Sequence, residues 1–191
     1  MSGTLSVILA AGLSRRFGAD DKLGAPLGDA PLLLHALRAA RAAGPGALLC
    51  IASERGAARD LCEAEGVSAI VNPDPGRGLG SSVALAADAA RKRGAARLLL
   101  TLGDTPRVDA DLLRAVEAAA RAAGSACTIC DGIRRPPACF GSESFEALCG
   151  LSGEEGARSL LRGVPAQGLV PAPAALLADI DRPGDLEALA R

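Results

Sequence analysis

Short apolar runs alternate with longer segments of helical periodicity along most of the chain. Such runs are typical of buried strands, and they predict strands at Leu5–Ala10, Ala47–Ala52, Ala69–Val71, Arg97–Leu102 and Ala126–Cys130. Helices are predicted near Pro31–Ala43, Arg55–Glu65, Ser81–Arg93, Asp109–Ala123, Ser142–Leu148, Glu155–Arg162 and Pro183–Ala190. Because strands that alternate with helices form parallel sheets covered on both faces, we expect a three-layer α/β fold with a mostly parallel central sheet.

The same pattern predicts one domain over residues 1–191, because no polar linker and no internal repeat interrupts it. Two segments that contain glycine and proline, Gly132–Pro137 and Gly163–Pro173, break the alternation. We expect them to form an inserted or irregular region over one end of the sheet.

Charge and composition exclude several classes of protein. The 21 basic and 22 acidic residues nearly cancel, and aromatic residues make up only 2% of the chain, so neither a basic surface nor rings for base stacking are available. No run approaches the roughly 20 apolar residues that span a bilayer, and no basic stretch precedes the first apolar run, which we interpret as a strand and not as a signal peptide. We therefore expect neither nucleic acid nor membrane as a partner.

The six cysteines are scattered through apolar and helical surroundings, which favours reduced thiols and a cytoplasmic location. Cys127 and Cys130 form a lone C-x-x-C pair. In a strand these two positions face opposite sides of the sheet, so we do not expect the pair to bind zinc.

The loop after the first predicted strand carries an unusual set of residues. Ligands of open parallel sheets lie beyond the carboxyl ends of the strands, where this loop is expected. The loop begins with the small residues Ala10, Ala11 and Gly12. Gly12 and Gly18 can present backbone N–H groups to anions, and Arg16 and Lys22 supply positive charges. The loop is either a phosphate cradle or a solvated basic turn.

Familiar catalytic templates do not match this loop. Lys22 is not followed by Ser or Thr as in a Walker loop, and Arg16 stands where a nucleophile elbow needs glycine. The single histidine, His35, lies in a predicted helix, so we expect it to be structural or solvated and expect no Ser-His-Asp triad.

Carboxylates follow two further predicted elements. Asp104 in "LGDTP" ends a strand, where it can bind Mg²⁺ or cap a helix. Asp179 and Asp181 lie two residues apart, on one side of an extended segment. Together with the first loop, these residues favour a site for a metal–nucleoside triphosphate.

Five motifs resemble those of the MobA-like nucleotidyltransferases, in the same order and over nearly the whole chain. The first loop resembles L-A-A-G-x-S-x-R-M-G-x-x-K, and "NPDPGRGLGSSV" resembles N-P-x…G-L-x-x-S. "LGDTP", "GEEGARSLL" and "DIDRPGDL" resemble L-G-D-x-P, G-D-x-G-A-R-x-L and D-I-D-T-P-x-D-L. Within the family, an opening of Ala-Ala-Gly at Ala10–Gly12 resembles molybdenum cofactor cytidylyltransferases, whereas Ala-Gly-Gly is more usual in guanylyltransferases.

The resemblance implies a Rossmann-like nucleotide-diphospho-sugar transferase fold and Mg²⁺-dependent transfer of CMP from CTP to the terminal phosphate of the molybdenum–pterin cofactor, with release of pyrophosphate. Carried over by position, it implies nucleotide binding by Ala10, Ala11, Gly12, Ser14, Arg16, Gly18, Lys22, Gly80 and Ser81. Lys22, Arg16 and Asp104 would be catalytic, Asp104 and Asp181 would hold the metal, and Arg135 and Arg158 would bind the acceptor. It also implies a transient contact with a molybdoenzyme or its chaperone.

The chain departs from the family pattern at four places. Phe17 replaces a usual Met, three residues instead of two separate Gly18 from Lys22, and Glu154 stands where Asp is common. Arg135-Pro136-Pro137 replaces Gly followed by His or Asn and then Pro. That last change indicates another phosphorylated acceptor, an extra arginine for an acidic pterin, or a rigid surface turn.

Three alternatives therefore stay open. The nucleotide could be GTP, the acceptor could be another small phosphorylated molecule, or the protein could be a non-catalytic carrier of the cofactor. A carrier would bind its ligand stoichiometrically and release no pyrophosphate, and it would have no need of paired metal ligands.

Overall fold

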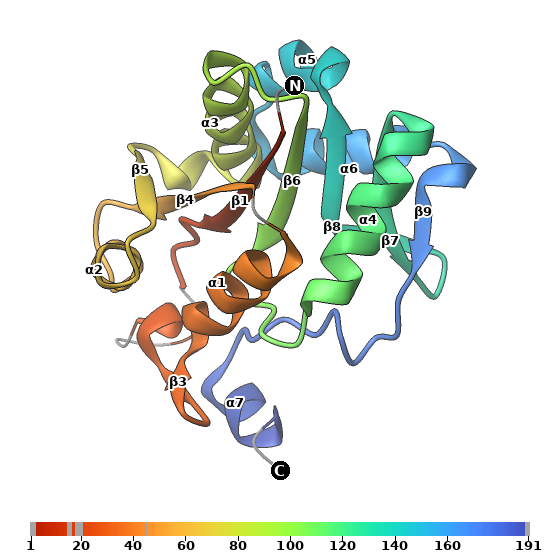
Figure 1. Cartoon of the computed structure of the whole chain (residues 1–191). Coiled ribbons are helices and arrows are strands. Elements are labelled where there is room, and N and C mark those ends of the chain that lie inside the picture. The colour runs from red at the N-terminus through yellow and green to blue at the C-terminus, as the bar shows by residue number, and fades with distance from the viewer. Residues whose placement is uncertain (1–2, 15–16, 18–20, 45, 190–191) are drawn as a thin grey trace.

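Seven strands form one sheet in the computed structural model, which describes residues 3–14, 17, 21–44 and 46–189. In sheet order they are β5 (Ser68–Asn72), β4 (Ala47–Ser53), β1 (Thr4–Ala10), β6 (Arg97–Leu102), β8 (Ile133–Gly141), β7 (Ser125–Cys130) and β9 (Leu169–Pro171). β1 pairs in parallel with β4 on one side and β6 on the other. β8 runs antiparallel to both of its neighbours, so the sheet is mostly parallel, as predicted (Figure 1).

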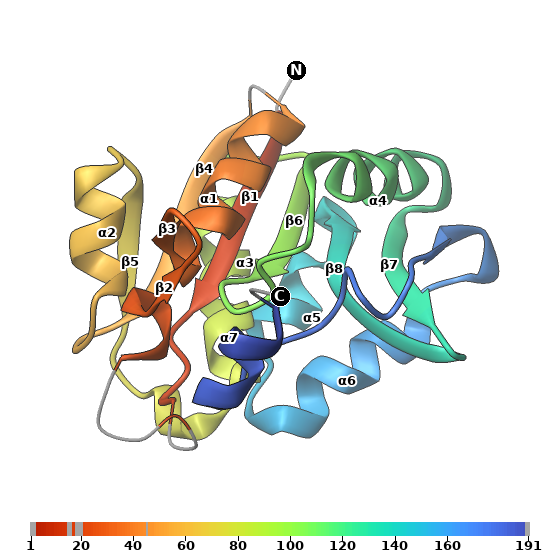
Figure 2. The same ribbon diagram turned by 90° about the horizontal axis from the view of Figure 1, so that it is seen from below.

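Helices cover both faces of the sheet (Figures 1 and 2). One face packs against α1 (Leu32–Ala43), α2 (Ala58–Ala64) and α4 (Ala110–Ala123). The other packs against α3 (Leu79–Lys92), α5 (Phe145–Cys149) and α6 (Gly153–Gly163). Successive side chains of β1 enter opposite cores, with Val7 and Ile8 both fully buried, as the period of a strand requires.

Short elements fill the connections. They are the hairpin β2 (Pro26–Leu27) and β3 (Ala30–Pro31), the 3₁₀ turns η1 (Lys22–Gly24), η2 (Pro75–Arg77), η3 (Ser142–Ser144) and η4 (Ala166–Gly168), and the helix α7 (Pro183–Leu189). The hairpin provides a hydrogen-bond partner for the single histidine. His35 Nε2 is part-buried and lies 2.9 Å from the carbonyl oxygen of Leu27. His35 is structural, as predicted.

The prediction of an irregular segment at Gly132–Pro137 is wrong, because Ile133–Pro137 begins β8. The register shifts from Cys127 opposite Ala138 to Thr128 opposite Arg135, which leaves the two prolines of β8 in a bulge. The hydroxyl of Thr128 donates to the carbonyl oxygens of Arg135 and Pro136. A bulge needs no ladder N–H from its extra residues, so prolines are tolerated there.

Two further predictions need adjustment. Gly163–Pro173 is not wholly irregular, because it contains η4 and β9. α2 begins at Ala58, three residues after the predicted start at Arg55.

The cysteines lie as the strand pattern predicts. Cys127 packs in one core and Cys130 against the other, so β7 directs them to opposite faces. All six cysteines are free. Within the described part of the chain, no helix is both long and apolar enough to cross a membrane.

Candidate functional site

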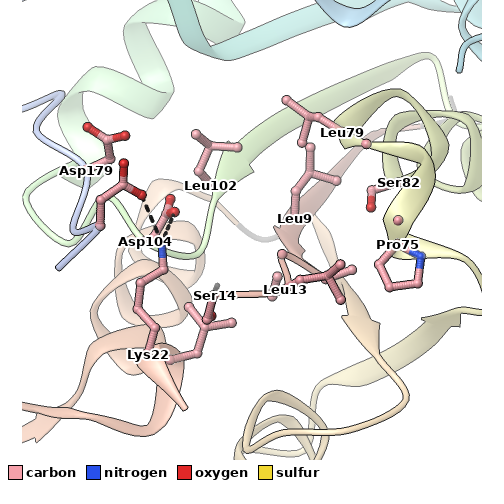
Figure 3. A pocket seen from close by; sticks show the side chains of 17 residues that line it. Leu9, Leu13, Ser14, Lys22, Pro75, Leu79, Ser82, Leu102, Asp104 and Asp179 are labelled. Atoms are coloured by element: carbon pink, nitrogen blue, oxygen red, sulfur yellow. Dashed lines mark hydrogen bonds and ion pairs between the residues drawn. The ribbon is translucent and has the colours of Figure 1, made fainter. Parts of the chain in front are cut away.

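Lys22 and two aspartates from distant parts of the sequence meet beyond the carboxyl ends of β1 and β6. Nζ of Lys22 donates to Oδ2 of Asp104 at 2.7 Å and lies 3.6 Å from Oδ1 of Asp181 (Figure 3). The lysine side chain is only 10% exposed, against 25% for Asp104 and 31% for Asp181. A cation buried to this degree needs such partners, because an unpaired buried charge is strongly unfavourable.

Backbone contacts explain how Asp181 reaches Asp104. Asp104 lies two residues beyond the end of β6, and its carbonyl oxygen accepts a hydrogen bond from the N–H of Ile180 at 3.0 Å. The Ile180 side chain is fully buried, which fixes the segment just before Asp181. Gly103 permits the crowding here, since a Cβ at that position would lie 3.0 Å from Leu33 Cδ1.

Asp185 holds Asp181 from the other side. Its Oδ2 accepts hydrogen bonds from the N–H groups of Asp181 at 2.9 Å and of Arg182 at 2.7 Å. These backbone bonds hold the pKa of the Asp185 carboxyl below its ordinary value, with a smaller contribution from the nearby positive charge of Lys22. The contacts close the first turn of α7.

A cavity of about 460 Å³ opens beside this cluster. Its size is within the usual range for small-molecule sites. It is lined by Leu9, Ala10, Ala11, Gly12, Leu13, Ser14, Lys22, Leu23, Pro75, Gly76, Gly78, Leu79, Ser82, Leu102, Asp104, Asp179 and Asp181. Figure 3 shows that Lys22, Asp104 and Asp179 lie at one end and Pro75, Leu79 and Ser82 at the other. The predicted loop and carboxylates therefore share one cavity.

A second hollow, of about 420 Å³, lies across the first loop. It shares six residues with the first cavity, among them Gly12, Leu13 and Ser14, and adds residues at and just beyond the carboxyl ends of β4 and β5. The loop therefore forms a wall between two hollows. Ser14 adopts a φ of 49°, which is uncommon for a residue with a side chain.

Gly80 and Ser81 lie in the first turns of α3 but outside the lining of both hollows. Gly80 is a packing residue, because a Cβ there would lie 2.6 Å from the carbonyl oxygen of Gly153 in α6. The residue that does line the cavity is Ser82, which the sequence reasoning missed. The adjacent serines at 81 and 82 gave no means to predict which of them lines the cavity.

Asn72 organises the segment that carries Ser82. Its side-chain N–H groups donate to the hydroxyl oxygens of Ser81 at 2.9 Å and of Ser82 at 3.0 Å. Its side-chain oxygen accepts from the N–H of Asp74 at 3.0 Å. Asn72 is 1% exposed, and this network engages both the N–H groups and the oxygen of its amide, which favours one fixed arrangement of the segment.

Arg16 and Gly18, both assigned to the nucleotide from the sequence, lie outside the described residues. Phe17 between them is 6% exposed and packs in the core, as expected for a residue that replaces Met. Its N–H donates to the carbonyl oxygen of Ser14 at 2.9 Å, which anchors the loop.

Arg135 and Arg158, assigned to the acceptor from the sequence, are not brought together. Arg135 pairs with Thr128, whose neighbours in β7 place it on the sheet face opposite α6, whereas Arg158 is exposed on α6 itself. Neither residue lines the hollows. Arg134 faces α6 and donates to the carbonyl oxygens of Leu161 and Arg162.

The donor set fits a magnesium ion. Oxygens of Asp104 and Asp181 both lie within ion-pair distance of one cationic atom, so they converge on a common point. Among the residues that the structure describes, no group of three or more His, Cys, Asp or Glu side chains could hold a metal. Mg²⁺ needs no such group, because it binds through one or two carboxylates plus water and substrate phosphates.

Comparisons with known proteins extend over most of the chain. The model of the family described as the MobA-like NTP transferase domain matches residues 6–170. Purine catabolism protein PucB of Bacillus subtilis is 31% identical over 166 residues, which are 83% of this chain and 80% of PucB. Bifunctional protein GlmU of Leifsonia xyli is 38% identical over 129 residues, which are 64% of this chain but only 26% of GlmU.

Solved structures with a similar fold cover nearly the whole chain. Rv0371c from Mycobacterium tuberculosis H37Rv superimposes with a TM-score of 0.81 at 26% identity, covering 99% of this chain and 97% of Rv0371c. The same protein has a crystal structure in complex with manganese, which superimposes with a TM-score of 0.79 at 25% identity, covering 99% of this chain and 98% of that one.

Proposed function

The chain belongs to the MobA-like NTP transferase family, and from this premise we propose that it transfers CMP from CTP to the terminal phosphate of the molybdenum–pterin cofactor. Pyrophosphate is the second product. The family makes the protein a nucleotidyltransferase; the nucleotide, the acceptor and the roles of single residues are our proposal.

One observation carries the proposal: the buried ammonium of Lys22 and the carboxylates of Asp104 and Asp181 meet in the cavity that the small-residue loop lines. A triphosphate needs cations, a close approach to backbone N–H groups and carboxylates for its metal. Residues Ala10–Gly12 lack bulk at the cavity wall, which leaves room for that approach. A carrier of the cofactor would need no such combination.

The choice of CTP is supported by Ala11, which gives the loop the Ala-Ala-Gly form of the cytidylyltransferases that it resembles. The choice of acceptor is supported by the same resemblance of Ala10–Gly12 to the cytidylyltransferases of the molybdenum cofactor, whereas the order of the five motifs supports the family. Arg135 and Arg158 stay the acceptor contacts that we propose from that resemblance, although they lie on different elements and neither lines the cavity.

In the proposed reaction, an oxygen of the acceptor phosphate attacks the α-phosphorus of CTP, and the bond from that phosphorus to the bridging oxygen of pyrophosphate breaks. A phosphate monoester is ionised near pH 7, so the reaction needs no general base. Lys22 offsets negative charge at the reacting phosphate, and Arg16 stabilises the departing pyrophosphate. Ser82 and the loop Ala10–Gly12 orient the nucleotide.

Asp104 and Asp181 are the proposed metal ligands. A Mg²⁺ ion held there would neutralise phosphate charge and align the two reacting groups. The manganese complex of Rv0371c supports a divalent ion in a protein with this fold. Asp179 lines the same end of the cavity, and Lys22 would exchange part of its contact with Asp104 for phosphate oxygens.

The proposal is tested by pyrophosphate release from the purified protein with Mg²⁺ and molybdenum-loaded pterin. CTP, GTP, ATP and UTP are supplied in separate reactions. We expect release with CTP, whereas release with GTP alone would keep the mechanism and overturn the choice of base. A parallel series with other small phosphorylated acceptors tests the second substrate. Tight stoichiometric binding of the pterin without pyrophosphate from any nucleotide would establish the carrier instead.

A further inference from the structure

Asp21, the residue before Lys22, joins two loops that are far apart in the sequence. Its Oδ1 accepts a hydrogen bond from the N–H of Leu23 at 3.0 Å. Its Oδ2 accepts one from the N–H of Ala57, 36 residues away, just before α2. A residue that only capped the η1 turn would need the first of these bonds alone.

Two glycines show how closely the loops approach. Gly56 has a φ of 108°, and a Cβ on it would lie 2.7 Å from Oδ2 of Asp21. A Cβ on Gly24 would lie 2.9 Å from the Cβ of Ala57. The turn that contains Lys22 is therefore packed directly against the Gly56–Ala57 backbone, with the Asp21 carboxylate between them.

This contact bears on the position of the Lys22 ammonium. Lysine has a flexible four-carbon side chain, so an Nζ held in one place requires a fixed backbone as well as partners at its end. Asp104 and Asp181 hold the end of the side chain, whereas the Asp21 carboxylate joins the backbone just after Lys22, at the N–H of Leu23, to the backbone N–H of Ala57.

We propose that Asp21 is a positioning residue that acts through Lys22, by fixing the Lys22 backbone against the loop before α2. The geometric part of this inference is independent of the reaction, and only its effect on turnover rests on the proposed function. A displacement of about 1 Å in a catalytic group is enough to lower a rate by about 10²-fold.

The composition of the chain offers a direct test. It contains two lysines, Lys22 and Lys92. The side chain of Lys22 is 10% exposed and that of Lys92 is 70% exposed. The rate at which an acylating reagent modifies Lys22, measured by mass spectrometry, therefore reports the burial of Lys22, with Lys92 as the internal standard. Asp21→Ala is expected to raise the acylation rate of Lys22 by about 2- to 30-fold, as for a lost cap, while the Lys92 rate stays constant.

Two variants make this test specific. Asp109→Ala is the matched control, because Asp109 caps α4 through the N–H of Leu112 and, among the described residues, is not one that lines either hollow. It is expected to lower stability without changing the acylation of Lys22. Asp21→Asn keeps one acceptor oxygen of the original two, so its Lys22 rate is expected to fall between wild type and Asp21→Ala.

Turnover gives the second measurement. Asp21→Ala is expected to lower kcat about 10- to 100-fold with little change in the KM for nucleotide, and Asp21→Asn to recover part of that loss. In the Lys22→Ala background the same substitution is expected to have no further effect, because the residue on which it acts is gone.

The outcomes separate the two proposals. If Lys22 stays as protected in Asp21→Ala as in wild type, or if kcat falls equally in both backgrounds, the positioning role is overturned. If wild type shows no turnover with any nucleotide but Asp21→Ala still exposes Lys22, the proposed reaction fails and the positioning of Lys22 stands.

Discussion

Lys22 is the lysine whose ammonium is buried, and its contacts are with the two proposed metal ligands. Lys22→Ala is expected to lower turnover about 10²–10³-fold, the usual cost of one lost electrostatic contact with a transition state. Lys92→Ala, which removes an exposed ion pair with Asp88, is the control and should leave turnover unchanged. Pyrophosphate release is the measurement, and a wild-type rate for folded Lys22→Ala would remove this residue from the mechanism.

Substitution of Gly80 and of Gly12 by alanine should have different effects, the first on stability and the second on nucleotide binding. A Cβ at Gly80 would overlap the backbone of α6, so Gly80→Ala should lower the free energy of unfolding by about 1–3 kcal/mol. A Cβ at Gly12 meets nothing within 4 Å, and this residue lines both hollows. Gly12→Ala should therefore keep stability but weaken nucleotide binding. Urea unfolding and calorimetric titration with CTP separate the effects, and the reverse pattern would contradict these roles.

Much of the site could be predicted residue by residue, but not its internal contacts. Lys22, Asp104 and Asp181 each lie within a recognisable motif. The topology of a parallel sheet brings the loops after its strands to one edge. The role of Asp21 could not be predicted, because its second partner is a backbone N–H 36 residues away. Such a contact depends on how two loops pack, so it produces no motif with a recognisable spacing in the sequence.

At the scale of elements, α7 acts as the support of Asp181. Asp185→Ala removes the acceptor for the N–H groups of Asp181 and Arg182, so the proposed metal ligand should become less well ordered. We expect the Mg²⁺ concentration for half-maximal turnover to rise several-fold, with partial recovery in Asp185→Asn. An unchanged Mg²⁺ dependence in Asp185→Ala would show that α7 does not support the site.

β8 shows where prediction of the elements failed. The five predicted strands all form, with ends within about one residue of those observed, because buried aliphatic runs are strong indicators of parallel strands. β8 was missed because Arg134–Pro137 reads as a turn, and its tolerance of two prolines depends on the bulge opposite Thr128. A bulge depends on how two strands pair, so the sequence of one strand alone cannot predict it.

For the whole molecule, buried thiols predict a loss of stability at alkaline pH. Burial raises the pKa of the Cys139 thiol to about 12 from an ordinary value of 9.0. Between pH 9 and 12 the unfolded chain has therefore lost a proton that the folded chain retains. Cys139 should therefore lower the free energy of unfolding as pH rises through this range, by about 1.4 kcal/mol per pH unit.

The chain contains no tyrosine, so its six cysteines and two lysines are the side chains that titrate in this range, and a cysteine variant isolates the contribution of one thiol. Urea unfolding of wild type and Cys139→Ala at pH 8 and pH 10.5 measures the effect. Cys139→Ala starts from a lower stability at pH 8, but its loss between the two pH values should be smaller. An equal loss in both proteins would show that Cys139 ionises as readily in the folded state.

The central claim is that metal-assisted nucleotidyl transfer takes place where Lys22, Asp104 and Asp181 meet. Asp104→Asn tests it most directly, because the substitution keeps the shape of the side chain and removes its charge. We predict Mg²⁺-dependent pyrophosphate release from CTP and the pterin acceptor by wild type, and a rate about 10²–10³-fold lower for folded Asp104→Asn. Equal rates for the two proteins would contradict the account.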